Sequence, residues 1–119
     1  MTVTLTLGTA QQPLRIATAA SFWRRFIGLL GRAGMAPDEA LLITPCNNIH
    51  TLFMRFAIDA VFLDRDGVIV AIVPQLRPWR FAVARAAYAC LELAAGGASR
   101  YALAPGQTLA ALARSGGRP

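Results

Sequence analysis

The sequence predicts a mostly β (α+β) fold: a single compact antiparallel domain, barrel-like or sandwich-like, with one clear helix at about residues 20–33 and one or two short helices. Three observations predict it. Residues 2–7 alternate polar and apolar types with the period of a half-buried strand. An Asp66-Gly67 turn separates two apolar runs, which is the pattern of a β-hairpin. A helical period is clear only within residues 21–32.

The N-terminal third is expected to hold a hairpin followed by the helix. Residues 14–18 alternate like residues 2–7, and turn-forming residues lie between the two runs. Within the helix, Phe22, Phe26 and Leu29 fall on one face, as in a helix that covers a core. The chain of 119 residues has the size of one domain. We assign residues 1–113 to that domain and expect a frayed tail at 114–119.

From residue 40 onward the pattern is mainly that of short strands. Residues 74–80 contain two prolines and are expected to form an irregular connection, and residues 86–93 fit either a strand or a helix. The remaining expected elements are strands at 41–44, 51–55, 59–63, 68–73 and 108–112, and one or two helical turns at 98–103.

Composition excludes several classes of protein. The chain is 55% hydrophobic and 15% charged, which is too apolar for a disordered chain. Its longest run without charge, residues 40–54, is shorter than the roughly 20 apolar residues of a membrane-spanning helix. The first residues lack the basic and apolar regions of a secretory signal, so a cytoplasmic protein is expected.

The charge balance is basic and rests on arginine alone. Twelve arginines against six acidic residues give a net charge of +6. Arginines bind phosphates, but here they are scattered along the chain, and no nucleic-acid-binding motif accompanies them. We therefore rank nucleic acid below a small ligand or a protein as the partner.

Cys46 and Cys90 are expected to be buried thiols rather than a disulfide, because no secretory signal indicates an oxidising compartment. A zinc site would need both to converge with His50, the one histidine, and would still lack a fourth ligand. We expect neither a metal nor another cofactor.

The densest polar cluster is residues 46–51, and it is the candidate ligand site. Asn48, His50 and Thr51 supply hydrogen-bond donors and acceptors, and Arg55 can bind a carboxylate or phosphate through two N–H groups. If residues 51–55 are extended, Thr51 and Arg55 share a face with Phe53. An alternative is structural: Asn47 and Asn48 shape a turn, His50 bonds a backbone carbonyl, and Met54 fills the core.

Two carboxylates, Asp59 and Glu92, lie within apolar runs. A buried carboxylate needs a partner, and Arg55, Arg77 and Arg80 are the candidates. The predicted ligand-binding set is therefore Asn48, His50, Thr51, Arg55, Asp59, Arg80 and Glu92.

Three segments, in this order and spacing, resemble the family called domain of unknown function 192, over roughly residues 25–109. They are Arg25-Phe26-Ile27-Gly28-Leu29-Leu30, His50-Thr51-Leu52-Phe53-Met54-Arg55-Phe56-Ala57-Ile58-Asp59 and Cys90-Leu91-Glu92-Leu93-Ala94-Ala95-Gly96. The resemblance implies a compact β-rich fold, a strand at 88–93 and no established activity. The chain departs from the family pattern at Leu30, Ala57 and Gln107, where the family often has Met, Pro and Asp.

These observations favour a small non-catalytic binding or accessory domain, with its polar or anionic ligand or protein partner near residues 47–55. A hydrolase or transferase that uses Cys46 or His50 with Asp59 is the first alternative, although no nucleophile-elbow or oxyanion motif precedes Cys46. Weak arginine-based nucleic-acid binding is the second. Trp79 and Phe81 flank Arg80 and also fit a protein interface, where aromatics and arginine are favoured.

Overall fold

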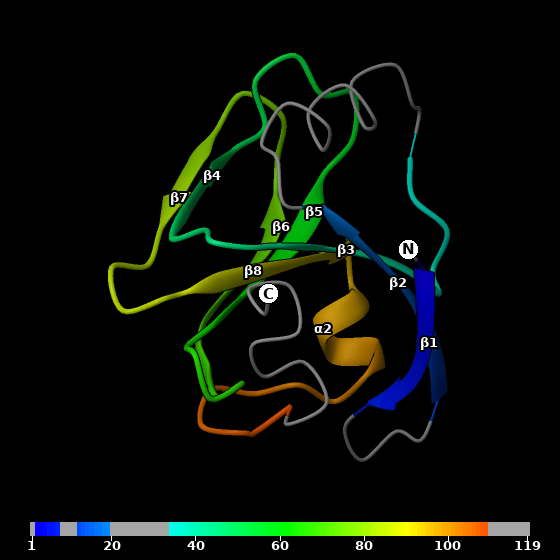
Figure 1. The fold of residues 1–119 in the computed structure, drawn as a ribbon. Helices are drawn as coiled ribbons and strands as arrows, with labels where there is room; N and C mark the ends of the chain where they lie inside the picture. The colour runs from blue at the N-terminus through cyan, green and yellow to red at the C-terminus, as the bar shows by residue number, and fades with distance from the viewer. Residues whose placement is uncertain (1, 8–11, 20–33, 110–119) are drawn as a thin grey trace.

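The computed structural model describes residues 2–7, 12–19 and 34–109, and these residues form a mostly β fold (Figure 1). A six-stranded sheet has the order β1-β2-β3-β8-β5-β6, and a small second sheet pairs β4 with β7. The bounds are β1 Thr2–Leu7, β2 Gln12–Ala19, β3 Glu39–Ile43, β4 Asn48–His50, β5 Ile58–Leu63, β6 Ile69–Leu76, β7 Phe81–Val83, β8 Ala89–Ala94 and the short helix α2 Gly97–Arg100. The predicted fold class is confirmed. The expected helix at 20–33 and the tail at 114–119 lie outside the described residues.

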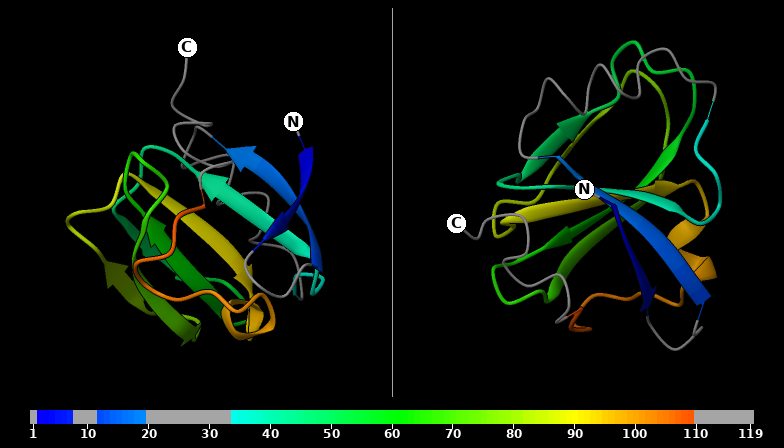
Figure 2. Two further views of the ribbon diagram at one scale, coloured as in Figure 1. Left: turned by 90° about the horizontal axis from the view of Figure 1, so that it is seen from below. Right: turned by 45° about the vertical axis from the view of Figure 1, so that its right-hand side comes forward.

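The large sheet is open and almost wholly antiparallel. Its one parallel pair is β2 with β3, where Ala17 lies opposite Leu41. Residues 20–38 connect these two strands, which agrees with the long crossover that parallel neighbours require. Within the described strands the edges β1 and β6 do not pair, so the arrangement is sandwich-like rather than a closed barrel. The β1–β2 hairpin and the β4–β7 sheet lie at opposite ends of the molecule (Figure 2).

Both predicted hairpins form. In the first, β1 pairs antiparallel with β2 along its whole length. In the second, the Asp64 carboxylate accepts hydrogen bonds from the backbone N–H groups of Asp66 (2.9 Å) and Val68 (3.0 Å). Gly67 follows at φ 80°, a conformation that glycine adopts without strain. This short-range hydrogen bonding turns the chain from β5 into β6.

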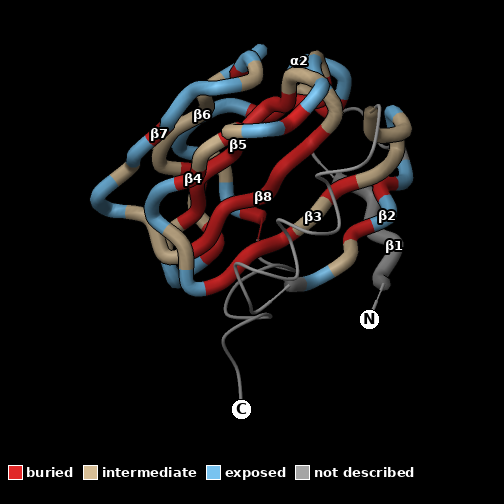
Figure 3. The backbone as a smooth tube through the Cα atoms, turned by 90° about the horizontal axis from the view of Figure 1, so that it is seen from above, coloured by how far each residue is buried: buried red, intermediate tan, exposed pale blue. Residues whose placement is uncertain are grey.

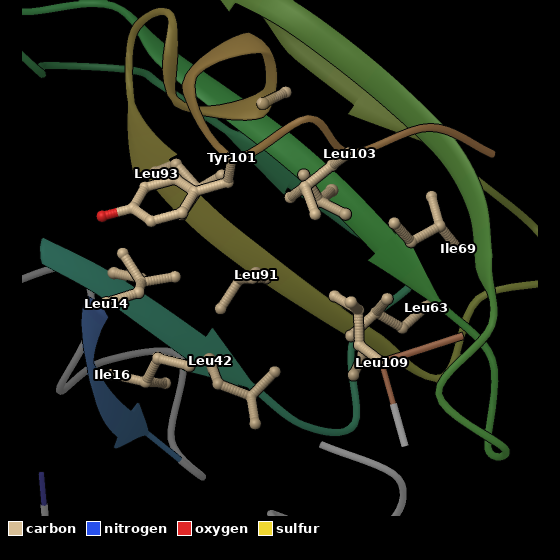
Figure 4. Packing of buried hydrophobic residues seen from close by; sticks show 14 residues of the cluster. Leu14, Ile16, Leu42, Leu63, Ile69, Leu91, Leu93, Tyr101, Leu103 and Leu109 are labelled. Carbon is tan, nitrogen blue, oxygen red and sulfur yellow. The ribbon is translucent and has the colours of Figure 1, made fainter. Parts of the chain in front are cut away.

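The large sheet carries a hydrophobic cluster on each face, because side chains alternate along its strands. In β5, Val61 and Leu63 pack into the first cluster, and Ala60 and Phe62 pack into the second. All six residues of β5 are buried, and so is most of its neighbouring strand β8 (Figure 3). Figure 4 shows the first cluster, which also contains Tyr101.

The segment around residues 51–56 was predicted wrongly. It forms turns rather than a strand, and the strand β4 ends before it, at His50. Thr51 and Met54 are buried while Phe53 and Arg55 are exposed, so the expected shared face of Thr51, Phe53 and Arg55 does not exist.

Other local details differ from the expected elements or decide between them. The edge strand β6 runs through Pro74 into the segment expected to be irregular, and an edge position tolerates the missing N–H of proline. The strand β7 was not foreseen, and Thr108 forms only an isolated bridge with Val68. Residues 86–93 resolve into strand β8 at Ala89–Ala94.

In the described ranges, no helix has the length and apolar character needed to cross a bilayer.

Candidate functional site

The candidate site is a lobe made of β4, β7 and the turns beside them, residues 48–55 and 77–83, which we call the aromatic lobe. Its two strands pair antiparallel, with His50 opposite Phe81 and Asn48 opposite Val83. Ile49 and Ala82 are buried and join the second hydrophobic cluster, so they fix the lobe to the large sheet. The lobe projects at one side of the fold in Figure 1.

Thr51 holds the two turns of the lobe together. Its N–H donates to the Arg80 carbonyl (2.9 Å), and its own carbonyl accepts from the N–H groups of Trp79 (3.0 Å) and Met54 (3.1 Å). Its hydroxyl donates to the Arg77 carbonyl and accepts from the Arg80 N–H (2.9 Å). Because Thr51 is fully buried, these bonds are shielded from water. Thr51 is therefore a structural residue of the lobe.

Phe53 and Trp79 lie at the tips of these turns in unusual conformations. Both have φ 66°, in the left-handed region, which costs a residue with a β-carbon roughly 1–2 kcal/mol. Their rings pack together at a tilt of 59°, with centroids 4.6 Å apart. Yet the two residues are 57% and 54% exposed. The turns thus hold a tilted aromatic pair in solvent at a conformational cost.

The lobe also collects the other exposed apolar side chains. Phe81 is 68% exposed and Val83 is 64% exposed. In the described ranges, the large hydrophobic side chains that remain exposed are these two together with Phe53 and Trp79, and all four belong to the lobe. The His50 ring lies 6.1 Å from the Phe81 ring. A clustered exposed apolar patch is a typical mark of an interaction site.

The charge around this patch is of one sign. Arg55, Arg77, Arg80 and Arg85 are exposed. The sequence has no Asp or Glu in residues 40–58 or 67–90, so the segments that build the lobe carry positive charge without neighbouring acids in the chain. An open pocket of about 340 Å³, lined by residues 73–77 and Arg80, lies beside the lobe.

The structure brings part of the predicted ligand set together in the lobe. Asn48, His50, Thr51 and Arg80 lie on its two strands and turns, and Arg55 lies at its exposed end. His50 accepts a hydrogen bond at Nδ1 from the backbone N–H of Leu52 (3.3 Å).

Asn47 and Asn48 form a side-chain hydrogen bond of 2.9 Å at the turn before β4, which agrees with their expected turn role. Cys46 and Cys90 are present as thiols, with Cys90 buried and Cys46 half-buried. The Cys46 thiol donates to the Asn48 carbonyl (3.1 Å).

Asp59 lies elsewhere, and its expected ion pair with an arginine was a wrong prediction. Its carboxylate is buried and accepts backbone hydrogen bonds from Gln75 (2.9 Å), Gly96 (3.1 Å) and Ala98 (2.9 Å). Gly96 is the N-cap residue immediately before α2 and has no side chain with which to cap the helix. A carboxylate reaching from β5 takes that role, and the three N–H groups offset the cost of burying its charge.

Glu92 is fully buried at the middle of the large sheet, opposite Leu41 on one side and Ala60 on the other. By strand alternation it shares the sheet face of Cys90, whereas Asp59 shares the opposite face with Val61. The two carboxylates therefore lie on opposite faces of the sheet and do not pair with each other.

The set Cys46, His50 and Asp59 is not assembled as a catalytic triad, since both Asp59 oxygens bond backbone amides on the α2 side of the sheet. Over the described part of the chain, no three His, Cys, Asp or Glu side chains lie close enough to hold a metal ion.

Sequence reasoning missed Phe53 and Val83 as members of the site. Phe53 was expected to lie on one face of a regular strand at residues 51–55. Val83 was missed because residues 81–83 were assigned to no strand or helix. The signal that was available is the concentration of aromatic and arginine residues within two segments that contain no acid.

Comparisons with known proteins agree with this fold. A UPF0127 protein of Pyrococcus furiosus is 37% identical over 76 residues, which are 59% of this chain and 62% of the relative, so the match spans less than two thirds of that relative's length. Two crystal structures are similar in fold. One is a protein of unknown function from Novosphingobium aromaticivorans (TM-score 0.77, 22% identity, 90% of this chain and 83% of the other). The other, from Sinorhizobium meliloti, is described as a "putative transcription regulator" (TM-score 0.74, 24% identity, 86% of each chain).

The family comparison covers nearly the whole chain. The model of the family DUF192, described as "Uncharacterized ACR, COG1430", matches residues 3–111. This match includes the three segments in which the sequence resembles that family. The chain therefore belongs to the DUF192 family.

Proposed function

We propose that this protein is a small non-catalytic binding domain whose aromatic lobe binds an acidic partner protein. The observation that carries the proposal is the tilted Phe53–Trp79 ring pair: both residues are more than half exposed, and both have φ 66°. Residues in such conformations persist only where the surrounding structure over-determines them, and they cluster at functional sites. Here the hydrogen bonds of Thr51 supply that support.

The chemistry of the lobe supports a protein partner. Tryptophan and arginine are the side chains most enriched among residues that dominate binding energy, and Trp79 lies directly before Arg80. The exposed arginines of the lobe have no acidic neighbours in the surrounding sequence, so they favour a partner surface of opposite charge and speed its approach.

The positions of the polar residues favour binding over the hydrolase or transferase alternative. The Cys46 thiol donates to a backbone carbonyl, and His50 Nδ1 accepts a backbone N–H. Asp59, the acid that would orient the histidine, bonds to backbone amides on the other face of the sheet.

The proposal is tested with two panels of fluorescein-labelled heptapeptides, in which Glu or Lys alternates with Val, Leu and Phe. Fluorescence anisotropy is expected to show tighter binding of the Glu panel, with a loss of about 10-fold or more in Trp79→Ala and Arg80→Ala. Arg100→Ala is the matched control, because it removes an exposed arginine of α2, outside the lobe.

Equal binding of the two panels, or Glu-panel binding that is insensitive to Trp79→Ala, would overturn the proposal. A labelled thymidine oligonucleotide is measured in parallel. Stronger, steeply salt-dependent binding of the oligonucleotide would instead support the nucleic-acid alternative, since aromatic rings and arginines also bind single strands.

A further inference from the structure

The backbone hydrogen bonds around β7 determine which of its groups face β4. Thr51 N–H donates to the Arg80 carbonyl (2.9 Å), and Ala84 N–H donates to the Asn47 carbonyl (2.8 Å). In the register of this pair, each of these bonds joins two directly opposite residues. Opposite residues in an antiparallel pair alternate between bonded and non-bonded. Residues 80, 82 and 84 therefore direct their N–H and C=O groups toward β4.

It follows that Phe81 and Val83 direct their N–H and C=O groups away from β4. Among the strands that the structure describes, β7 pairs only with β4. The edge of β7 that faces away from β4 therefore pairs with no described strand. Figure 1 shows β7 at the outer margin of the fold. The same two residues are 68% and 64% exposed, so one face of β7 is accessible, and its outer edge pairs with no described strand.

The edge of β7 is short but carries no blocking residue. Natural edge strands are commonly protected by short length, charged side chains, proline or a bulge, and the three residues of β7, Phe81–Val83, include no charge and no proline. Phenylalanine and valine are strong strand formers and pack well against side chains of a neighbouring strand. The β7 edge thus offers backbone donors and acceptors together with two apolar side chains.

The surrounding charge indicates what kind of strand would pair there. Arg77 and Arg80 precede β7, Arg85 follows it, and all three are exposed. No acidic residue occurs between residues 67 and 90. A basic segment would be repelled, and a segment with acidic residues among apolar ones would be attracted.

We propose that an extended acidic segment of a partner protein adds to the outer edge of β7 as a third strand of the small sheet. This inference rests on the proposed function and specifies its binding mode. The backbone groups of Phe81 and Val83 pair with the added strand, its apolar side chains lie beside theirs, and its carboxylates meet the three arginines.

The test uses amide hydrogen exchange by NMR on the full chain, with the tightest-binding Glu-panel heptapeptide as probe. The amides of Phe81 and Val83 are expected to gain about 10-fold or more protection at saturation, because they become donors in a new ladder. The Ala82 amide, which faces β4 in the unbound protein, is the internal control and is expected to change little.

Two variants test the backbone contribution. Val83→Pro removes an N–H that faces away from β4, so the fold is expected to persist while peptide binding falls about 10-fold or more. Val83→Ala keeps that N–H and is the matched control. A second test does not depend on protein folding. Two peptides are made, one N-methylated at its odd-numbered residues and the other at its even-numbered residues. An added strand bonds through every second residue, so one peptide is expected to lose binding and the other to keep it.

The outcomes separate the two proposals. Strand addition is overturned if both methylated peptides still bind and the amides of Phe81 and Val83 gain no protection from hydrogen exchange. If binding nevertheless depends on Trp79, the proposed binding function stands. No preference for the Glu panel overturns the binding function itself.

Discussion

Thr51 and Arg80 are hydrogen-bonded in both directions: the Thr51 N–H donates to the Arg80 carbonyl (2.9 Å), and the Arg80 N–H donates to the Thr51 hydroxyl (2.9 Å). The same hydroxyl donates to the Arg77 carbonyl. One buried side chain therefore satisfies backbone groups of a turn that lies 26 to 29 residues further along the chain. The turns that present Phe53 and Trp79 depend on it.

Thr51→Val keeps the shape of the side chain but leaves the Arg77 carbonyl and the Arg80 N–H without their shared partner. We expect the free energy of unfolding to fall by about 1–3 kcal/mol, the cost of unsatisfied buried polar groups. Thr51→Ser keeps the hydroxyl and is expected to retain most of the stability. Urea unfolding compares the variants, and a valine variant as stable as the native chain would contradict the structural role of the hydroxyl.

Asp59→Asn tests the carboxylate that caps α2. The amide nitrogen of asparagine cannot accept a hydrogen bond, so at least one of the three backbone donors loses its partner, and the charge is lost as well. We expect a loss of about 2–4 kcal/mol in the free energy of unfolding. Amide exchange should accelerate first at Gln75, Gly96 and Ala98. Asp66→Asn, in an exposed turn, is the control and should change stability little.

Trp79→Asn is expected to leave the free energy of unfolding within about 1 kcal/mol of the native value. Asparagine tolerates the left-handed conformation, so the strain relieved at φ 66° offsets the lost contact with Phe53. Leu91→Ala, at a fully buried position, is expected to cost about 2–5 kcal/mol under the same conditions. Thermal or urea unfolding measures both, and a large loss in Trp79→Asn would mean that this residue serves folding.

Gly97→Ala is expected to destabilise the protein by about 1–3 kcal/mol through overpacking. An added β-carbon would lie 2.7 Å from the β-carbon of Leu93, and that atom is close to the β8 backbone, so α2 or β8 must shift. Gly34→Ala is the matched control, because the β-carbon there would meet no atom within 4 Å. Equal unfolding midpoints for the two variants would rule out close packing of α2 on β8.

Low pH should weaken the contact between β2 and the turn before β3. The Arg15 guanidinium donates two hydrogen bonds of 3.0 Å to Asp38, and these bonds lower the pKa of that carboxyl. A lowered pKa in the folded state stabilises the fold at pH values above the unfolded pKa of about 3.9, and this stabilisation is lost as the pH falls through the folded pKa.

The stability difference between the native chain and Asp38→Asn should therefore be present at neutral pH and vanish in acid. Both side chains are about half-exposed, so added salt should reduce the difference. NMR titration of the Asp38 carboxyl provides the direct check, and an unshifted titration midpoint would contradict the ion pair.

Features determined by neighbouring residues could be predicted from the sequence. The turn from β5 to β6 needs only Asp64, Asp66 and Gly67, which lie next to one another in the chain. The alternating run at residues 2–7 likewise pairs with its next neighbour in the chain.

Features determined by distant backbone groups could not be predicted. Residues 51–55 form turns because Thr51 bonds to residues 77–80, and no local pattern records those partners. The candidate site divides in the same way: Asn48, His50 and Thr51 were nominated because polar types concentrate near residue 50, whereas Phe53 and Val83 were missed. The donors to Asp59 lie 16 to 39 residues away, and they are backbone groups of Gln75, Gly96 and Ala98, which side-chain chemistry does not reveal.

The two turns of the lobe are fixed by main-chain groups and one buried hydroxyl, whereas Phe53, Trp79, Phe81 and Val83 point their side chains into solvent. The scaffold of the lobe and its recognition chemistry are thus encoded by different residues. Substitutions at these four positions can change partner preference while the main-chain path stays the same. Such a division lets a single fold acquire new specificities through exchange of a few exposed side chains, much as loops do on a rigid framework.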